Sequence, residues 1–337
     1  MGLEMDPSHL AAAEVHVNGK LTVKKGGVTQ LRPGILRDGE VADLAALTDA
    51  LRVLFSENDL GTRVRLGVAN QRIVVRTLDV PVVADEASLD AAVRAAAPDN
   101  IPVPMDEAVL DFQPLGVVDT PAGPRTRVVV VAVRRDMIER MIAATQEAGL
   151  TVEGVDLSAF GMIRALRAGQ SDQAVLYVNV AGLINVAVAD DRGCLFTRAA
   201  AGGLDAITQT LSDRRGLTID HARGWMQHVG LETELSSIEG DPQLVAGVRQ
   251  TLEEGVHQIA DSVRNSLNFY RMQDSAESVE RAVLTGPAVL VPGFAEGLGR
   301  ELGLAVEPML VALDADAPTA DAGRLTVAAG LALADPA

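Results

Sequence analysis

Two parts of the chain alternate hydrophobic and polar residues with the period of two that β-strands show. Residues 13–24 alternate around the dipeptide Asn18-Gly19, the strongest short-range signal for a β-hairpin. After mid-chain, hydrophobic runs at residues 175–180 and 184–188 are followed by a turn and the strand-like sequence CLFTRA. Each half of the chain therefore opens with a strand meander, which suggests a duplicated architecture.

Helical spacing of hydrophobic residues fills the intervals between the strand patterns. It predicts helices over residues 41–55, 87–97, 135–148, 203–215, 219–229 and 241–270. Further strands are predicted over residues 63–69, 72–80, 127–133 and 281–284. This alternation favours α/β layers over a helical bundle or a β-sandwich. The most hydrophobic stretch, residues 174–189, is shorter than the roughly 18–20 residues of a membrane span, so we expect buried strands there.

Composition narrows the function classes. The chain has 337 residues, 48% of them hydrophobic, which is enough for a large core and more than one subdomain. With 29 basic and 46 acidic residues the net charge is -17, so nucleic acid and a bare membrane surface are poor partners. One cysteine and no apolar leader predict a cytoplasmic protein that meets the membrane through a partner.

Familiar catalytic motifs are missing from the sequence. The spacing Gly34 to Gly39 resembles a phosphate-binding loop but is followed by Glu40, where such a loop needs lysine. The histidines are scattered, and we expect them at the surface or at the edge of the core. Cys194 lies in an apolar strand pattern, which predicts a buried, inert thiol. We therefore predict neither a catalytic residue nor a metal site.

Residues 64–116 are similar to a known family. The stretch VRLGVANQRIVVRTLDVPVV and the following EASLDAAVRAAAPDNIPVPMDEAVLDFQPLG resemble the type IV pilus assembly protein PilM family. The features that match are Arg76, Pro81, the pair Ile101-Pro102 and the strand Asp111-Phe112-Gln113.

The second half extends the resemblance over nearly the whole chain. FTRAAAGGLDAIT is similar to the family's Arg, Gly-Gly and Thr pattern, at Arg198, Gly202, Gly203 and Thr208. SVRNSLNFYRMQ and LTGPAVLVPGF continue it. The resemblance implies an α/β, actin-like fold of two RNase-H-like domains, related to the cell-division protein FtsA, with a small inserted subdomain in the first domain. The boundaries that we expect are residues 1–80 and 156–172 for the first domain, 81–155 for the insertion and 173–337 for the second domain.

The same resemblance implies a nucleotide cleft between the domains, and the first half departs from the family there. The family's Gly-Leu-Asp-Ile-Gly-Ser pattern aligns with Gly2 to Pro7, and its lysine aligns with Ala11. Glu4 keeps a carboxylate, but Asp6 places a negative charge where phosphate should lie, which costs a few kcal/mol at about 4 Å. Pro7 also removes a backbone donor.

The second half departs from the family as well. Asp-Ile-Gly of the family aligns with Asn179-Val180-Ala181, unless Gly182 takes over that turn. A helix patterned Glu-Ala-Glu-x-x-Lys has Arg223 for its second glutamate and Met226 for its lysine. The adenosine loop, Gly-Gly in the family, is Gly286-Pro287. The residues of this degenerate cleft are Glu4, Asn179, Gly182, Gly202, Gly203 and Gly286.

The leading hypothesis is a PilM-like scaffold that captures the N-terminal tail of a PilN-like inner-membrane protein, without ATP turnover. No cofactor is expected, although ATP with Mg²⁺ follows from the family resemblance. The expected partner-binding residues are Arg76, Pro81, Ile101, Pro102, Asp111 and Gln113. One alternative is an active ATP-binding switch of the same fold, which holds if the first seven residues are aligned differently or if the chain binds nucleotide with other groups. Another is an FtsA-like filament protein, and a related secretion system or a homo-oligomer also stays open.

Overall fold

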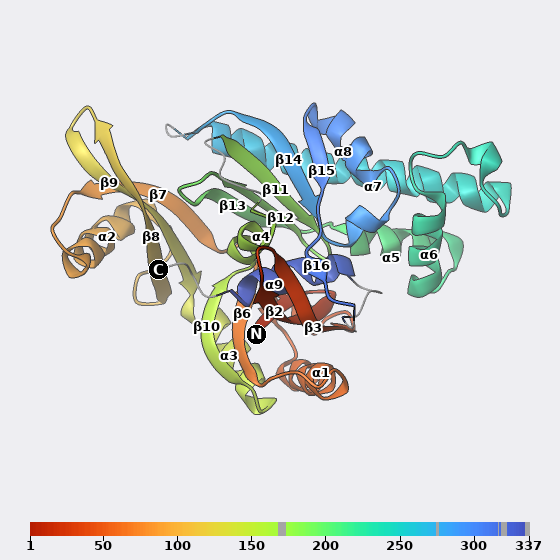
Figure 1. Ribbon diagram of the computed structural model, residues 1–337, viewed down its shortest axis with the longest axis horizontal. Coiled ribbons are helices and arrows are strands. Elements are labelled where there is room, and N and C mark those ends of the chain that lie inside the picture. The colour runs from red at the N-terminus through yellow and green to blue at the C-terminus, as the bar shows by residue number, and fades with distance from the viewer. Residues whose placement is uncertain (168–172, 274–275, 316, 318–321, 334–337) are drawn as a thin grey trace.

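The computed structural model describes residues 1–167, 173–273, 276–315, 317 and 322–333. Its first sheet has the strand order β10-β6-β1-β2-β3-β16 and occupies the lower half of Figure 1. The strands are β1 (Gly2–Asp6), β2 (His9–Val17), β3 (Leu21–Gln30), β6 (Arg63–Val68), β10 (Thr151–Leu157) and β16 (Ala312–Leu313). A short hairpin of β4 (Leu36–Arg37) and β5 (Glu40–Val41) lies beside it.

The hairpin predicted at Asn18-Gly19 is confirmed. Strands β2 and β3 pair antiparallel up to Val17 and Leu21, and Gly19 has a φ of 73°, a conformation that glycine adopts without strain. Helix α1 (Leu44–Glu57) begins three residues later than predicted, because the side chain of Asp43 accepts a hydrogen bond from the backbone N–H of Ala46 and so caps the helix.

The second sheet repeats the topology of the first. Its order is β13-β12-β11-β14-β15, and it contains β11 (Ala174–Val180), β12 (Ile184–Ala189), β13 (Cys194–Ala200), β14 (Val279–Thr285) and β15 (Ala305–Pro308). In each sheet an antiparallel meander of three strands is extended by two parallel strands. The duplication suggested by the two meanders is therefore confirmed, and the hydrophobic stretch at residues 174–189 forms two buried strands.

Helices cover the second sheet and lie between the two sheets. The covering helices are α5 (Leu204–Arg215), α6 (Ile219–Val229), α7 (Pro242–Arg271) and α8 (Phe294–Leu302), with the 3-10 turns η1 (Leu235–Ser237), η2 (Pro287–Leu290) and η3 (Ala322–Arg324). Between the sheets lie α4 (Ser158–Leu166) and α9 (Thr326–Leu331), as Figure 1 shows. Helix α4 packs Met162 and Ile163 against Tyr177 and Ala187 of the second sheet, so it joins the two domains.

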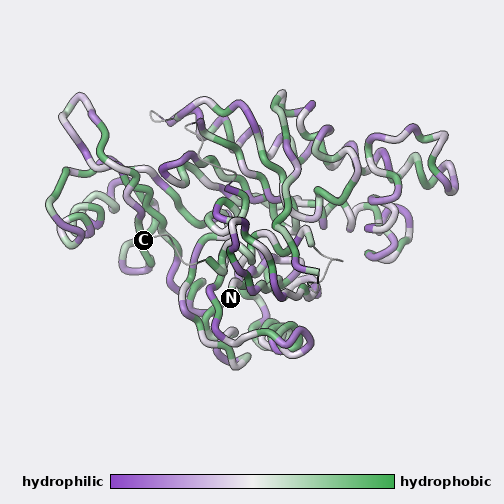
Figure 2. The backbone as a smooth tube through the Cα atoms, in the orientation of Figure 1, coloured by the Kyte–Doolittle hydropathy of each residue, from purple (hydrophilic) through white to green (hydrophobic). Residues whose placement is uncertain are grey.

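A small sheet projects from the first domain on the left of Figure 1. Its order is β7-β9-β8, with α2 on one face, and its elements are β7 (Val74–Pro81), α2 (Glu86–Asn100), β8 (Ala108–Thr120) and β9 (Gly123–Arg134). Val93 of α2 packs against Leu78 and Val130. Figure 2 shows hydrophobic residues in the inner part of the β8–β9 hairpin and more polar residues at its tip.

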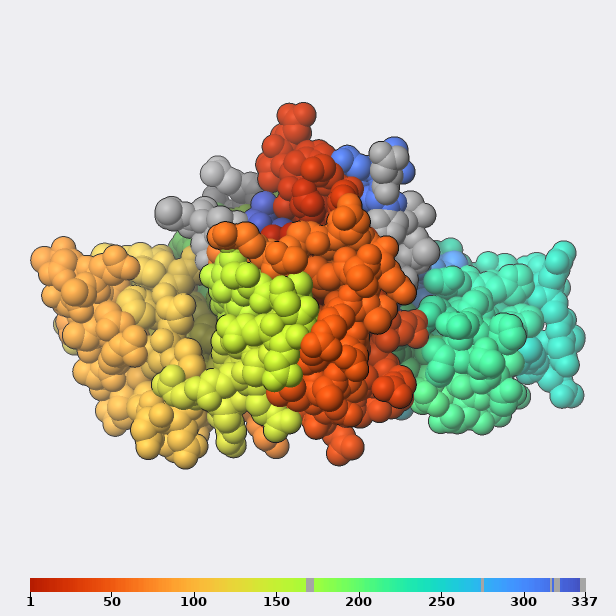
Figure 3. All heavy atoms as spheres, turned by 90° about the horizontal axis from the view of Figure 1, so that it is seen from below, coloured from red at the N-terminus to blue at the C-terminus, as the bar shows by residue number. Residues whose placement is uncertain are grey.

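The strand pairing suggests limits for this insertion that differ from those expected from the sequence. The sequence placed residues 81–155 in it, but β7 pairs with β9, whereas α3 (Arg135–Glu147) and β10 pack into the first domain. We therefore propose an insertion of residues 74–134. At the C-terminal end, β16 pairs with β3 of the first sheet, although the sequence assigned it to the second domain. Residues 168–172, next to the expected boundary, lie outside the described residues. Figure 3 shows the insertion beside the yellow-green segment that contains β10.

Candidate functional site

The β1–β2 turn of the first domain meets the β11–β12 turn of the second domain directly. The backbone N–H of Leu183 donates a hydrogen bond of 3.1 Å to Oδ2 of Asp6, and this contact is buried. A Cβ atom at Gly182 would lie 1.9 Å from Oδ1 of Asp6, so no side chain fits at that position. The glycine allows the two turns to approach closely.

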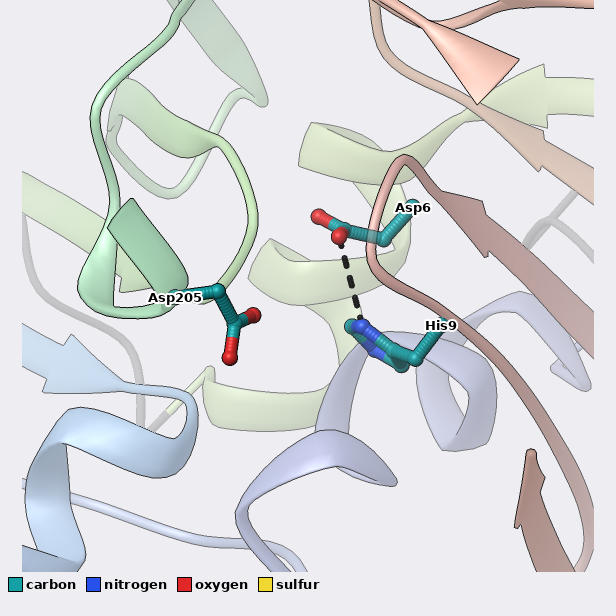
Figure 4. Close-up of side chains that lie close together, drawn as sticks. All are labelled: Asp6, His9 and Asp205. Atoms are coloured by element: carbon teal, nitrogen blue, oxygen red, sulfur yellow. Dashed lines mark ion pairs between the residues drawn. The ribbon is translucent and has the colours of Figure 1, made fainter. Parts of the chain in front are cut away.

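Ser8 and Asp205 make a second connection. The hydroxyl oxygen of Ser8 lies 2.7 Å from Oδ1 of Asp6 and 2.6 Å from Oδ2 of Asp205, which opens helix α5. A hydroxyl has one proton, so Ser8 donates to one of these carboxylates at a time. Figure 4 shows Asp6 on the first-domain turn and Asp205 on the second domain facing the same space.

A buried arginine balances this negative charge. Arg324 of η3 has a side chain that is 3% exposed, and its two terminal nitrogens lie 2.7 Å and 3.1 Å from the two carboxylate oxygens of Asp205. Such a bidentate pair is geometrically specific as well as strong. Burial acts to raise the pKa of Asp205, but the charge and hydrogen bonds of Arg324 outweigh it and hold that pKa below its ordinary value.

His9 completes the cluster, contrary to its expected place at the surface or core edge. Its ring is 1% exposed, and its Nδ1 lies 2.8 Å from a guanidinium nitrogen of Arg324. A guanidinium only donates, so this contact assigns Nδ1 as the acceptor, and the same nitrogen lies 3.3 Å from Oδ1 of Asp6. Nε2 is buried without a partner in the described structure. The prediction for His9 was wrong because its contacts come from the far end of the chain.

Glu4 lies behind the turn with its carboxyl group buried. Burial raises the pKa of Glu4 well above its ordinary value, and the negative charge of Asp6 raises it further, although Arg324 opposes both. Its partner across the β1–β2 ladder is Ala11, the position that the family resemblance assigned to a lysine. With alanine there, no positive side chain lies opposite Glu4 on β2.

One more contact crosses between the domains farther from the turns. With its amide oxygen oriented toward Arg223 of α6, Gln30 at the end of β3 accepts from both terminal nitrogens of that arginine, at 2.5 Å and 2.6 Å. This orientation is assigned from the hydrogen bonds that it satisfies. Arg223, which stands where the family resemblance expected a glutamate, therefore links the two domains.

A separate groove lies between the first domain and the insertion. One wall carries Arg65 of β6, Asp156 of β10 and Phe160 of α4, and the other carries residues of β8, including Asp111 and Gln113. In Figure 3 the yellow-green segment that contains β10 lies beside the yellow part of the insertion. Two of the six expected partner-binding residues thus line one groove.

Comparison with known proteins identifies the family. The family model described as Type IV pilus assembly protein PilM matches residues 2–335. The chain belongs to the PilM family of type IV pilus assembly proteins. It is similar to the solved PilM-PilN type IV pilus biogenesis complex, with 26% identity and a TM-score of 0.77, over 98% of this chain and 96% of that chain.

Two further structures share the actin-like fold. MreB5 of Spiroplasma citri bound to ADP has 12% identity and a TM-score of 0.52, over 98% of this chain and 93% of that one. The ethanolamine utilization protein EutJ from Carboxydothermus hydrogenoformans has 15% identity and a TM-score of 0.50, over 98% and 88%. The α/β, actin-like fold expected from the sequence is confirmed.

The cleft residues of this PilM-family chain do not fit a magnesium nucleotide. Among the described residues, one group of side chains has the spacing to hold a metal ion. It consists of Asp6, His9 and Asp205, whose possible ligand atoms all lie within 4.8 Å of one another. The guanidinium of Arg324, however, lies between Asp205 and His9, and a cation there repels a second one. The Leu183 N–H that could face a phosphate already binds Asp6.

The other predicted cleft residues surround this cluster. A Cβ at Gly203 would lie 2.2 Å from the carbonyl oxygen of Ala181, so Gly203 packs on the same turn as Gly182, while Gly202 has open space around it. A Cβ at Gly286 would lie 2.3 Å from Oδ1 of Asn179. The structure therefore brings the predicted residues together, but the sequence missed those that fill the cleft, which are Ser8, His9, Leu183, Asp205 and Arg324. Ser8 follows Pro7, Leu183 follows Gly182 and Asp205 lies two residues after Gly203, so all three stood beside positions named from the resemblance, whereas Arg324 did not.

The remaining partner-binding predictions lie away from the groove. The guanidinium of Arg76 lies 5.6 Å from the ring centroid of Phe269 on α7, so it faces the second domain. Ile101 is buried in the core of the insertion, and Pro81 and Pro102 are exposed near the ends of β7 and α2. Among the described residues, no helix has both the length and the hydrophobicity to cross a membrane.

Proposed function

We propose that this PilM-family protein is a scaffold of the inner-membrane platform that assembles type IV pili, and that it binds the cytoplasmic N-terminal tail of a PilN-like membrane protein. It would then lie on the cytoplasmic side of the membrane and reach it through that partner. The observation that most supports this proposal is the similarity to the PilM-PilN complex, which extends over nearly the whole length of both chains. Family membership favours this role over that of a cell-division filament protein.

The groove between β8 and β10 is the place that we propose for the tail. Both strands are edge strands of their sheets, so each has backbone donors and acceptors that no neighbouring strand among the described residues pairs. An extended peptide binds such an edge by main-chain hydrogen bonds, with side-chain pockets adding specificity. On β8 this pairing has limited length, because Pro114 lacks an N–H and the ladder is irregular between Pro114 and Gly116.

The side chains of the groove suit a tail with both hydrophobic and polar residues. Phe112 and Phe160 supply hydrophobic surface, one from each wall. Glu86 and Asp111 place carboxylates on the insertion side, whereas Asp156 on the opposite wall pairs with Arg164. The acidic side of the groove favours a tail that carries a positive charge.

Calorimetric titration with a synthetic N-terminal peptide of the PilN-like protein from the same organism tests the site. We expect the double variant Asp111→Ala/Gln113→Ala to bind at least about tenfold more weakly than the wild type. Asp119→Ala, an exposed change at the far end of the same strand, is the matched control and should bind as the wild type does. Unchanged binding by the double variant would refute the groove, and failure of the wild type to bind would refute the partner.

We further propose that the protein acts without ATP turnover, because Asp6 and Arg324 lie where the two turns could otherwise hold a phosphate and its metal. The alternative is an ATP-dependent switch of the same fold. Titration with ATP and Mg²⁺, with ADP as a control, separates the two. Heat of binding at micromolar nucleotide would favour the switch, and its absence up to high micromolar concentrations would support the scaffold.

A further inference from the structure

The cleft contacts join parts of the chain that are far apart in sequence. Ser8 and Asp205 are 197 residues apart, and Arg324 is 119 residues from Asp205 and 315 from His9. Arg324 lies in the segment that leads into α9, which packs against β1 of the first domain. Arg324 contacts both His9 of the first domain and Asp205 of the second domain, so its side chain lies between the two domains.

The cluster holds one anion against backbone N–H groups and one cation against Asp205 and His9. A turn that presents backbone N–H groups is a natural anion site. Here the anion is the Asp6 carboxylate, which accepts from the N–H groups of Leu183 and Ser8, at 3.1 Å and 2.9 Å. The cation is the Arg324 guanidinium, which is held by Asp205 and His9. The protein thus provides both charges from its own side chains.

The second domain also supports the tail groove. A Cβ at Gly193, in the β12–β13 turn, would lie 3.3 Å from Leu115 and 3.7 Å from Nε2 of Gln113. Gln113 lines the groove, and Leu115 is buried next to it on β8. A movement of the second domain relative to the first would therefore displace Gly193 against the groove wall.

We infer that Asp6 and Arg324 form an intramolecular latch, a built-in substitute for a bound nucleotide, that keeps the two domains in one arrangement and holds the tail groove in its binding form. The latch consists of Asp6, Ser8, His9, Leu183, Asp205 and Arg324. Its effect on the groove rests on the proposed function, but the latch itself does not. Because the latch fills the cleft with its own charges, the cleft does not fit a magnesium nucleotide.

Hydrogen–deuterium exchange of the full-length protein tests the latch, because the Leu183 amide hydrogen is itself one of the bonds between the domains. In Arg324→Met the peptide that contains Leu183 should exchange at least about tenfold faster than in the wild type. The matched control is Arg214→Met, which removes an exposed ion pair with Glu254 inside the second domain and should leave this exchange unchanged. Asp205→Asn, which keeps the shape of the side chain, serves if Arg324→Met does not fold.

The outcomes separate the latch from the proposed function. If exchange at Leu183 is unchanged in both Arg324→Met and Asp205→Asn, the latch is overturned. It is also overturned if adding ATP with Mg²⁺ slows this exchange in the wild type. The nucleotide is added at about 1 mM, so that even weak binding is detected. If the latch controls the groove, the same variants bind the tail peptide about tenfold more weakly, and unchanged affinity overturns that coupling. If the wild type binds no tail peptide, the proposed function fails while the exchange result stands.

Discussion

A Cβ atom at Gly330 would lie 1.7 Å from the carbonyl oxygen of Gly161, so the helices α9 and α4 touch backbone to backbone between the two sheets. A Cβ at Gly161 would in turn meet the side chain of Leu331 at 2.8 Å. This contact fixes how closely the two domains approach at the centre of the molecule, since α4 packs on the second sheet and α9 on the first.

We expect Gly330→Ala to destabilise the protein by about 1–3 kcal/mol, because the added methyl group meets backbone atoms that cannot move aside. Chemical denaturation measures this loss. Gly224→Ala is the matched control, since Gly224 lies within α6 with no atom near its Cβ position. The control should gain about 0.5–1 kcal/mol from helix propensity. Equal stabilities for the two variants would contradict the close contact of α4 with α9.

Removing one partner of the buried Arg324–Asp205 pair should cost much more than removing an exposed pair. We expect Arg324→Ala to lower the free energy of unfolding by about 3–5 kcal/mol, because Asp205 is left charged and largely buried. Arg214→Ala should change it by less than about 1 kcal/mol. Urea denaturation of the two variants measures the difference, and a loss for Arg324→Ala as small as that of the control would argue against a buried ion pair.

The raised pKa of Glu4 predicts a pH dependence of stability. Between the ordinary carboxyl pKa of about 4.3 and the raised value, the folded protein keeps a proton that the unfolded chain has lost. The free energy of unfolding therefore falls as the pH rises through this window. Glu4→Gln should remove the decline, so that the variant is more stable than the wild type at pH 8 and similar to it at pH 4.

Urea denaturation at several pH values tests this expectation for Glu4. Glu14→Gln, which changes a partly exposed carboxylate paired with Lys24, should keep the wild-type slope. A slope that persists in Glu4→Gln would show that another group carries the proton.

The buried thiol of Cys194 should not react in the folded protein. Burial raises its pKa to about 12, and the sulfur donates to the carbonyl oxygen of Phe196 at 3.3 Å. Because the thiolate is the reactive form, a disulfide reagent at pH 8 should modify the native chain only as it unfolds, whereas full modification in denaturant is expected. Rapid modification without denaturant would show that the second domain opens at Cys194.

Local sequence patterns determined many strands and helices and the duplication of this protein, but they did not predict α4, α8 and α9. The hairpin at Asn18-Gly19, the helix Ile219–Val229 and the meander from Ala174 follow from hydrophobic periodicity and turn residues, which act over a few positions. The family resemblance then supplied the actin-like fold and the two places to inspect, because many weak matches in one order are together specific. Asp111 and Gln113, expected from the same resemblance to bind a partner, line a groove, and their role in binding stays a prediction.

Tertiary structure alone decided what fills the cleft and which sheet β7 joins. His9 and Arg324 are 315 residues apart, and no periodicity records that a histidine in one turn will meet an arginine near the end of the chain. The strand β7 looked like part of the first domain because its pattern is that of any half-buried strand. The pairing of β7 with β9 depends on the strand register and on which face of β7 packs against α2. Both are set only when the whole chain packs.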